Sequence, residues 1–271
     1  MPILNKDMSL CISLSGRPSN IGTRFHNYLY DELGLNFIYK AFSTEDLPGA
    51  IAGVRALGIR GCSVSMPFKE EIMELVDEIE PSAAAIDSVN TIVNHDGRLV
   101  ASNTDFEAIA ALIDRHGLNA RSSVLVRGSG GMAKAVVAAF REAGFSDVTV
   151  LARNAHAGKA LADKYGYRHA SADPVPGHQI LVNVTPLGMD GENAETLSFT
   201  AEHIASAQSI FDVVAFPSET PLIRNARDAG KQVITGAEVI ALQAAAQFEK
   251  YTGHPLTEEQ VLRASEFSRE S

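Results

Sequence analysis

The sequence of 271 residues has few of the features that mark a specialised class of protein. Its only cysteines are Cys11 and Cys62, with no C-x-x-C pair, which predicts buried free thiols in a reducing cytoplasm. No run of about 18 apolar residues occurs, so no membrane span is expected. The first ten residues also lack the apolar segment of a signal peptide. The eight histidines show no H-E-x-x-H or other paired spacing, so no metal site is predicted.

An excess of positive charge is missing as well. The formal net charge is −10, which argues against binding to nucleic acid. Hydrophobic residues make up 45% of the chain and charged residues 21%, a balance typical of globular proteins. This length suits one large domain or two modest ones.

The chain does contain a regular alternation of short β-branched runs and helical spacing. In the first part, strands are expected at 10–15, 37–42 and 61–65, helices at 23–34, 44–58 and 69–79, and a hairpin over 91–102 turning at Asp96-Gly97. Thr44 is expected to cap the second of these helices and Gly58 to end it. In the second part, helices at 105–117, 132–144, 156–166 and 220–230 alternate with strands at 123–128, 147–153, 179–185, 209–215 and 231–236. This alternation predicts an α/β fold in which helices cover both faces of a parallel sheet. Two last helices, 238–251 and 257–268, have no strand after them and are expected to pack back on the first domain.

A glycine loop follows the strand at 123–128. Its residues are Gly128, Ser129, Gly130, Gly131, Met132 and Ala133, the pattern G-x-G-x-x-A between a strand and a helix. The first glycine permits a tight turn, the second allows close approach of a pyrophosphate, and the alanine lets the helix pack on the strand. The free N–H groups of the helix then face the phosphates, so the loop predicts a dinucleotide site.

The end of the next strand indicates which dinucleotide is bound. An NAD site commonly has an acid there for the ribose 2′-hydroxyl, but this strand ends at Leu151-Ala152-Arg153-Asn154. Arg153 can pair with a 2′-phosphate, which favours NADP and leaves NAD as the less favoured alternative. Ligands of open α/β sheets bind at the carboxyl ends of strands, where Thr185 and Gly236 are also expected to contact the cofactor.

Lys69 and Asp105 stand out among the charged residues. Lys69 follows Pro67 at the start of a helix, where a cation is poorly placed, and Asp105 belongs to the stretch SNTDFE. A solvated lysine and a helix-capping aspartate are the ordinary interpretations. Together beside a nicotinamide, however, they would supply the proton that carbonyl reduction needs.

Five motifs make the chain similar to the shikimate dehydrogenase family over essentially its whole length. They are SVSMPFKEE, DSVNTI, SNTDFE, GSGGMAKA and LQAAAQF, and the chain looks most like the divergent shikimate dehydrogenase-like branch. The resemblance implies a substrate domain of residues 1–103 with 238–271 and a Rossmann NADP-binding domain of residues 104–237. It also implies that the C-terminal helix returns to the first domain.

The resemblance assigns Lys69 and Asp105 to proton transfer at the reacting hydroxyl. It also implies substrate contacts at Asn20, Gly22, Ser65, Asn90 and Gln243. The family's two carboxylate-binding serines fall on Asn20 and Gly22, so the proton chemistry is retained while carboxylate recognition is altered. Arg17 and Arg24 flank this loop and could replace the lost hydroxyls, although solvated arginines are the favoured interpretation.

The resemblance therefore implies an NADP-dependent dehydrogenase of the shikimate pathway, in aromatic amino acid biosynthesis, and the cysteine usage places it in the cytoplasm. Its substrate is expected to be shikimate or a close analogue, with weak turnover of shikimate itself. Quinate or another hydroxy acid is the alternative, and a non-catalytic NADP-binding regulator is a distant third. A short-chain dehydrogenase is disfavoured because no Y-x-x-x-K occurs. The expected partners are a small-molecule substrate and, at most, a second copy of the chain, as a monomer or homodimer.

Overall fold

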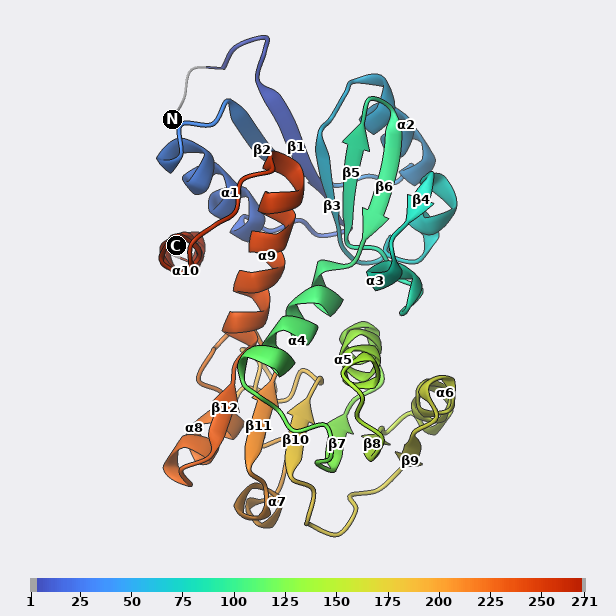
Figure 1. The fold of residues 1–271 in the computed structure, drawn as a ribbon, viewed down its shortest axis with the longest axis vertical. Coiled ribbons are helices and arrows are strands. Elements are labelled where there is room, and N and C mark those ends of the chain that lie inside the picture. The colour runs from blue at the N-terminus through green and yellow to red at the C-terminus, as the bar shows by residue number, and fades with distance from the viewer. Residues whose placement is uncertain (1–3, 270–271) are drawn as a thin grey trace. The chain divides into compact units, whose positions relative to one another are not determined.

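The chain forms two compact units in the computed structural model, which describes residues 4–269 (Figure 1). One unit comprises the chain up to Thr104 together with the residues from Ala241 onward, and the other spans 105–240. The chain passes between the units within helix α4 (Thr104–Arg115) and again within helix α9 (Gly236–Thr252). None of the helices in residues 4–269 has both the length and the apolar character needed to span a bilayer.

The first unit is built on a mixed sheet with the strand order β2-β1-β3-β5-β6-β4. Its strands are β1 (Ser9–Leu14), β2 (Phe37–Phe42), β3 (Gly61–Val64), β4 (Glu78–Ile79), β5 (Thr91–His95) and β6 (Arg98–Ser102). β1 pairs in parallel with β2 and β3, whereas β5 runs antiparallel to β3 and β6. The carboxyl ends of β1 and β3 therefore lie next to the amino end of β5.

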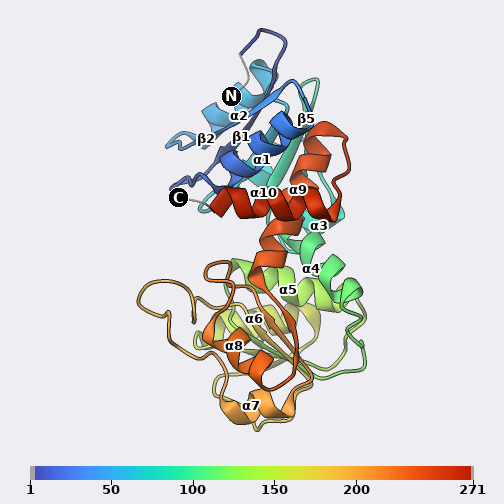
Figure 2. The same cartoon turned by 90° about the vertical axis from the view of Figure 1, so that its left-hand side faces the viewer.

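Helices cover both faces of this sheet. They are α1 (Ile21–Glu32), α2 (Leu47–Ala56), α3 (Pro81–Ala84), the 3₁₀ helix η1 (Glu71–Leu75) and α10 (Glu258–Arg269). Val54 of α2 packs with Cys62 in one core cluster, while Phe25 of α1 packs with Phe248 of α9 and Ala264 of α10 in another. Figure 2 shows α1 and α10 lying side by side. The return of the C-terminal helices to the first unit is confirmed.

The predicted hairpin at residues 91–102 is confirmed. β5 and β6 pair across it in register, with His95 opposite Arg98. Asp96 and Gly97 both have positive φ, 52° and 94°. This is the backbone of a type I′ turn, which an Asp-Gly pair favours because it matches the twist of the strands.

The helix predicted at residues 69–79 is wrong. The 3₁₀ helix η1 occupies its middle, and Val76 after it is extended. The backbone N–H of Asp77 donates to the carbonyl of Leu99 at 3.0 Å, and β4 pairs with β6. Tertiary pairing with β6 therefore overrides the helical spacing of the apolar residues.

The cap predicted for the second helix is also wrong. Asp46, not Thr44, is the N-cap of α2, and its carboxylate accepts from the N–H of Gly49 at 2.9 Å. The Thr44 hydroxyl instead accepts from the N–H of Asp46 at 3.0 Å. Gly58 follows the helix end with φ of 63°, as its predicted role requires.

The second unit is a parallel sheet with the strand order β12-β11-β10-β7-β8-β9. Its strands are β7 (Val124–Arg127), β8 (Val148–Leu151), β9 (Arg168–Ala170), β10 (Ile180–Asn183), β11 (Ser209–Asp212) and β12 (Gln232–Ile234). Starting from β7, the chain adds two strands on one side and then three on the other. This is the doubly wound Rossmann order, with a switch point between β7 and β10.

The helices of this unit are α5 (Gly131–Glu142), α6 (Ala155–Tyr165), α7 (Ala201–Ser206) and α8 (Pro221–Asp228). Side chains of α7 and α8 pack with Leu125, Leu151 and Leu181 on one face of the sheet. Right-handed crossovers place α5 and α6 on the opposite face, because β8 and β9 extend the sheet in the other direction. The short elements β9 and α7 were not predicted, since neither is long enough to show a period.

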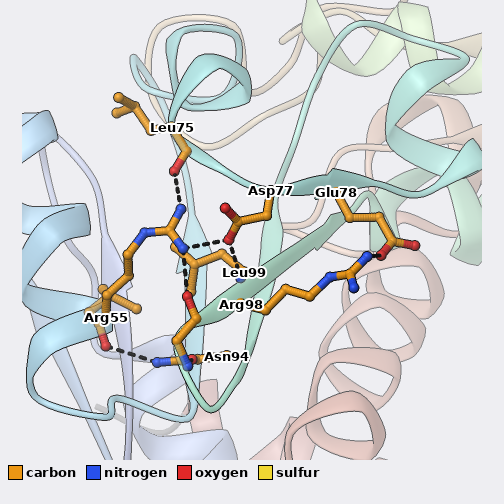
Figure 3. Close-up of polar contacts among 9 residues, drawn as sticks. Arg55, Leu75, Asp77, Glu78, Asn94, Arg98 and Leu99 are labelled. Atoms are coloured by element: carbon orange, nitrogen blue, oxygen red, sulfur yellow. Dashed lines mark hydrogen bonds and ion pairs between the residues drawn. The ribbon is translucent and has the colours of Figure 1, made fainter.

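The turn of the β5–β6 hairpin is tied to the rest of its unit by Arg55 (Figure 3). Its guanidinium pairs with Asp77 and donates to the carbonyls of Leu75 at 2.9 Å and Gly97 at 2.6 Å. Asp77 also accepts from the N–H of Leu99 at 2.7 Å. The hydrogen bond from Arg55 and this backbone bond together lower the pKa of the Asp77 carboxyl.

We predict that Asp77→Asn lowers the melting temperature at neutral pH. The folded pKa of Asp77 lies below the ordinary value of 3.8, so its contribution is fully present above that value. It is lost as the pH falls through the folded pKa, and the difference from wild type should therefore narrow below pH 3.8. Melting curves between pH 7 and pH 3 measure this, with the exposed Glu45→Gln as control. Parallel curves over the whole range would contradict it.

Candidate functional site

The glycine loop opens onto a cavity of about 540 Å³ in the second unit. Residues from the ends of several strands line it: Arg127, Gly128, Ser129, Gly130, Leu151, Ala152, Arg153, Asn154, Ser171, Ala172, Asp173, Val184, Thr185, Pro186, Leu187 and Asn193. The structure therefore brings Gly128–Gly130, Arg153 and Thr185 to one cavity, at the carboxyl ends of β7, β8 and β10.

The glycines of the loop are required for different physical reasons. Gly128 has φ of 127°, and a Cβ there would lie 2.7 Å from Val184 Cγ2. A Cβ on Gly130 or Gly131 would meet nothing within 4 Å, so these glycines leave open space above the backbone. Gly130 is the N-cap of α5 and offers no side chain to the first-turn N–H groups. This arrangement fits the pyrophosphate of a dinucleotide.

Three further predicted cofactor residues, Met132, Ala133 and Gly236, do not line this cavity. Met132 and the fully buried Ala133 follow in the first turn of α5. Gly236 is the first residue of α9, and a Cβ there would lie 2.2 Å from the carbonyl oxygen of Val214. Close packing of two backbones therefore explains the glycine at 236, and this residue does not line the cavity.

Two buried residues that were not predicted hold the loop of Thr185. Asn183 Oδ1 accepts from the N–H and the hydroxyl of Thr185 at 3.1 and 2.6 Å, and its amide donates to Asp212 at 3.0 Å. Asp212 also accepts from the Thr220 hydroxyl at 2.7 Å. Burial raises the pKa of Asp212, against the effect of these hydrogen bonds. The network fixes one wall of the cavity.

The second group of predicted residues lies in the first unit, where β1 and β3 end and β5 begins. Ser65 follows β3 and donates its backbone N–H to Leu14 at 2.9 Å. Lys69 belongs to the turn after it and accepts at its carbonyl from the N–H of Val89 at 2.8 Å. Asn90 precedes β5 and is 1% exposed. Adjacent strands thus bring Ser65 and Asn90 to one end of the sheet.

The side chain of Asn90 has a fixed orientation. Its Oδ1 accepts from the N–H of Thr104 at 2.8 Å and from the hydroxyl of Thr91 at 2.8 Å. A backbone N–H can only donate, so the atom facing Thr104 must be the oxygen. Within the described residues, the buried Nδ2 has no hydrogen-bond partner. Asn90 therefore presents a donor, which would suit a ligand oxygen.

Asp105 is the second residue of α4 and is 9% exposed. It comes directly after Asn103 and Thr104, both buried, and Asn103 donates its amide to the carbonyl of Ser88 at 2.8 Å. Lys69 belongs to the first unit and Asp105 to the second. Their roles stay predictions.

Comparison with known proteins decides the family. A model of the shikimate dehydrogenase substrate binding domain matches residues 20–92. A shikimate dehydrogenase-like protein of Haemophilus influenzae is 57% identical over 98% of this chain and 99% of its own. The chain belongs to the shikimate dehydrogenase family. An NADP(+) shikimate dehydrogenase of Chlorobaculum tepidum is 36% identical over 85% of each chain.

Solved structures of the family agree with this fold. A shikimate 5-dehydrogenase-like protein superposes with a TM-score of 0.97 at 56% identity, covering 99% of this chain and 100% of that one. The Thermus thermophilus shikimate 5-dehydrogenase, solved with NADP(H) and shikimate, gives 0.86 at 30% identity over 96% of this chain and 100% of its own. The predicted family and two-domain α/β fold are confirmed.

The positions of the family's serine pair have a simple local structure in this chain. Asn20 is the exposed N-cap residue of α1, and its side chain makes no capping hydrogen bond. Gly22 lies in the first turn, where a Cβ would be 3.6 Å from the hydroxyl oxygen of Tyr39, an ordinary contact. Neither residue has a positive φ. The backbone at Gly22 therefore does not require glycine.

Arg24 does not serve as a free replacement for these serines. Its guanidinium donates to the carbonyl of Phe267 in α10 at 2.9 and 3.1 Å and lies 4.6 Å from the centre of that ring. The arginine thus ties α1 to α10. Arg17 is exposed in the loop.

Gln247, four residues after the predicted Gln243, is the glutamine of α9 that reaches the Asn90 network. It is 3% exposed, and its amide nitrogen lies 3.0 Å from Thr91 Oγ1 and 3.3 Å from Ser63 Oγ. Because Gln247 donates to Thr91, the Thr91 hydroxyl is left to donate to Asn90 Oδ1. The spacing LQAAAQF puts both glutamines on one helix, but it gave no sign of which one is buried.

We predict that Gln247→Met lowers the free energy of unfolding by about 1–3 kcal/mol, because a buried hydroxyl acceptor loses its donor. Urea denaturation measures the change. Gln243→Met, a matched substitution at a half-buried position of the same helix, is the control and should cost less. Equal stability of Gln247→Met and wild type would count against the network.

Proposed function

We propose that this protein is an NADP-dependent dehydrogenase that moves hydride reversibly between the nicotinamide and a ring carbon of a cyclic hydroxy acid. The observation that carries the proposal is the cavity lined by Gly128–Gly130, Arg153 and Thr185, with no acid at the end of β8. The names of family relatives, which specify shikimate and NADP(+), support it. The second unit binds the cofactor, and the first unit binds the substrate.

In this mechanism Gly128–Gly130, Arg153 and Thr185 would hold NADP, which would supply the acceptor and, when reduced, the donor of the hydride. Lys69 and Asp105 pass the proton to and from the reacting oxygen, which removes the charge that would otherwise build up there. Asn90 donates from Nδ2 to a substrate oxygen and so orients the ring. The assignment of Asn90 is supported by its saturated Oδ1, since only its donor remains for a ligand.

The substrate is shikimate with 3-dehydroshikimate, or a close analogue, as a step of aromatic amino acid biosynthesis. Quinate or another hydroxy acid is the second candidate, favoured by the missing side chain at Gly22 and the amide at Asn20. Hydrogen bonds to a charged group are worth about 1.5–3 kcal/mol each, so shikimate turnover should be weak compared with other family members. The protein acts in the cytoplasm, as a monomer or homodimer.

Lys69→Met is expected to lower kcat for shikimate oxidation by about 10²–10⁴-fold, the usual range for loss of a general acid–base group. The dissociation constant for NADPH should not change, because the cavity for the cofactor belongs to the other unit. Formation of NADPH followed by absorbance measures the rate. Lys6→Met, at a lysine whose side chain is 89% exposed, is the control. Unchanged kcat in Lys69→Met would refute its role.

Restoring both serines, as Asn20→Ser with Gly22→Ser, should raise kcat/KM for shikimate by about 10-fold or more, since two hydroxyl donors return to the carboxylate. The space beside Tyr39 accepts the new Cβ without strain. Gly53→Ser in α2, where a Cβ would meet nothing within 4 Å, is the matched control. A rise in kcat/KM for quinate but not for shikimate would favour the second candidate.

A further inference from the structure

A second arginine lines the cofactor cavity, and nothing in the glycine motif accounts for it. Arg127 is the last residue of β7, directly before Gly128. Its guanidinium pairs with Asp173, and the two side chains are 20% and 49% exposed. Both residues line the cavity together with Arg153. Among the lining residues, Asp173 is the sole carboxylate.

The pair lies across the end of β8. In the sheet, Arg127 of β7 is opposite Leu151, the last residue of β8, and Leu151 is opposite Ala170, the last residue of β9. Asp173 follows β9 by three residues. An ion pair between the residues that end β7 and follow β9 must therefore span the carboxyl end of β8. In a Rossmann unit this is where the 2′ position of the adenosine ribose lies.

Arg127 keeps further capacity to bind an anion. Its guanidinium carbon lies 5.1 Å from the centre of the Phe199 ring, which holds the plane in place. Its Nε is buried and has no hydrogen-bond partner within the described residues. A guanidinium has five N–H donors, and a phosphate binds it more fully than one carboxylate oxygen does.

We propose that Arg127 is a second cation for the 2′-phosphate of NADP and that Asp173 competes with the phosphate for it. This inference rests on the proposed use of NADP and adds the determinant of its preference over NAD. Arg153 and Arg127 attract the phosphate, while the carboxylate of Asp173 repels it and occupies Arg127 when no cofactor is bound. NADH has no 2′-phosphate and keeps only its pyrophosphate charge, so its binding is expected to depend much less on both charges.

Dissociation constants for NADPH and NADH, measured by calorimetry with the purified full chain, test the proposal. Asp173→Asn is expected to tighten NADPH about 3- to 10-fold and to change NADH by less than about 2-fold, because it removes the competing charge at constant shape. Arg127→Gln is expected to weaken NADPH by about 10-fold, again with little effect on NADH. Both effects on NADPH should shrink as the salt concentration rises.

The matched control is Asp147→Asn. Asp147 pairs with Arg168 at the opposite end of β8 and β9, away from the cavity. It should leave both dissociation constants unchanged. Equal changes in the dissociation constants for NADPH and NADH in Arg127→Gln and Asp173→Asn would overturn the proposal, because the pair would then only shape the cavity. Weaker NADPH binding in Asp173→Asn would overturn it as well. Failure of the wild type to bind either dinucleotide would instead overturn the proposed function. Asp173 is half-exposed, so Asp173→Asn is expected to fold. Whether this variant binds NADPH more tightly or more weakly than wild type tests the proposal even if Arg127→Gln does not fold.

Discussion

The fixed amide of Asn90 is the constraint on which one end of the sheet in the first unit depends. A side-chain amide can flip and so exchange its donor and acceptor positions. Here the Thr104 backbone N–H and the Thr91 hydroxyl both donate to Oδ1, which fixes the orientation of the Asn90 amide. Gln247, more than 150 positions further along the chain in α9, donates to the Thr91 hydroxyl, so this hydroxyl donates its own hydrogen to Asn90. The fixed orientation of this one side chain therefore requires β5, the start of α4 and helix α9 to be assembled together.

The second unit meets a different requirement, since a glycine-rich loop must keep its shape around an anionic ligand. Gly128 has a positive φ and no room for a Cβ beside Val184, and its N–H donates to the carbonyl of Leu151 at 2.8 Å. The facing loop is held by the buried pair of Asn183 and Asp212, which satisfies hydrogen bonds that the irregular backbone around Thr185 would otherwise leave open. The open space at the glycines is thus bounded by rigid groups, as pre-organised binding requires.

Much of the fold could be predicted because its signals are local. The hairpin needs only Asp96-Gly97 between alternating residues, and the glycine loop needs only a strand before it and a helix after it. The segment 69–79 could not be predicted, because pairing with β6 is a contact with residues far away in the sequence. The same holds for Gln247 and for the pair of Arg127 with Asp173. Their residue types are ordinary, and only the sheet order brings them to a site.

The residues proposed to set substrate and cofactor preference are all assigned away from the reacting atoms. Lys69 and Asp105, assigned to the reacting oxygen, keep the family's residue types. Asn20, Gly22 and Arg127 lie where the distant ends of the two ligands are proposed to bind. Binding energy from non-reacting groups selects the substrate and helps to lower the barrier, while the proton and hydride steps are common to many substrates. Under the proposed roles, changes confined to those ends would alter which acid and which dinucleotide are preferred, and would leave the reaction itself intact.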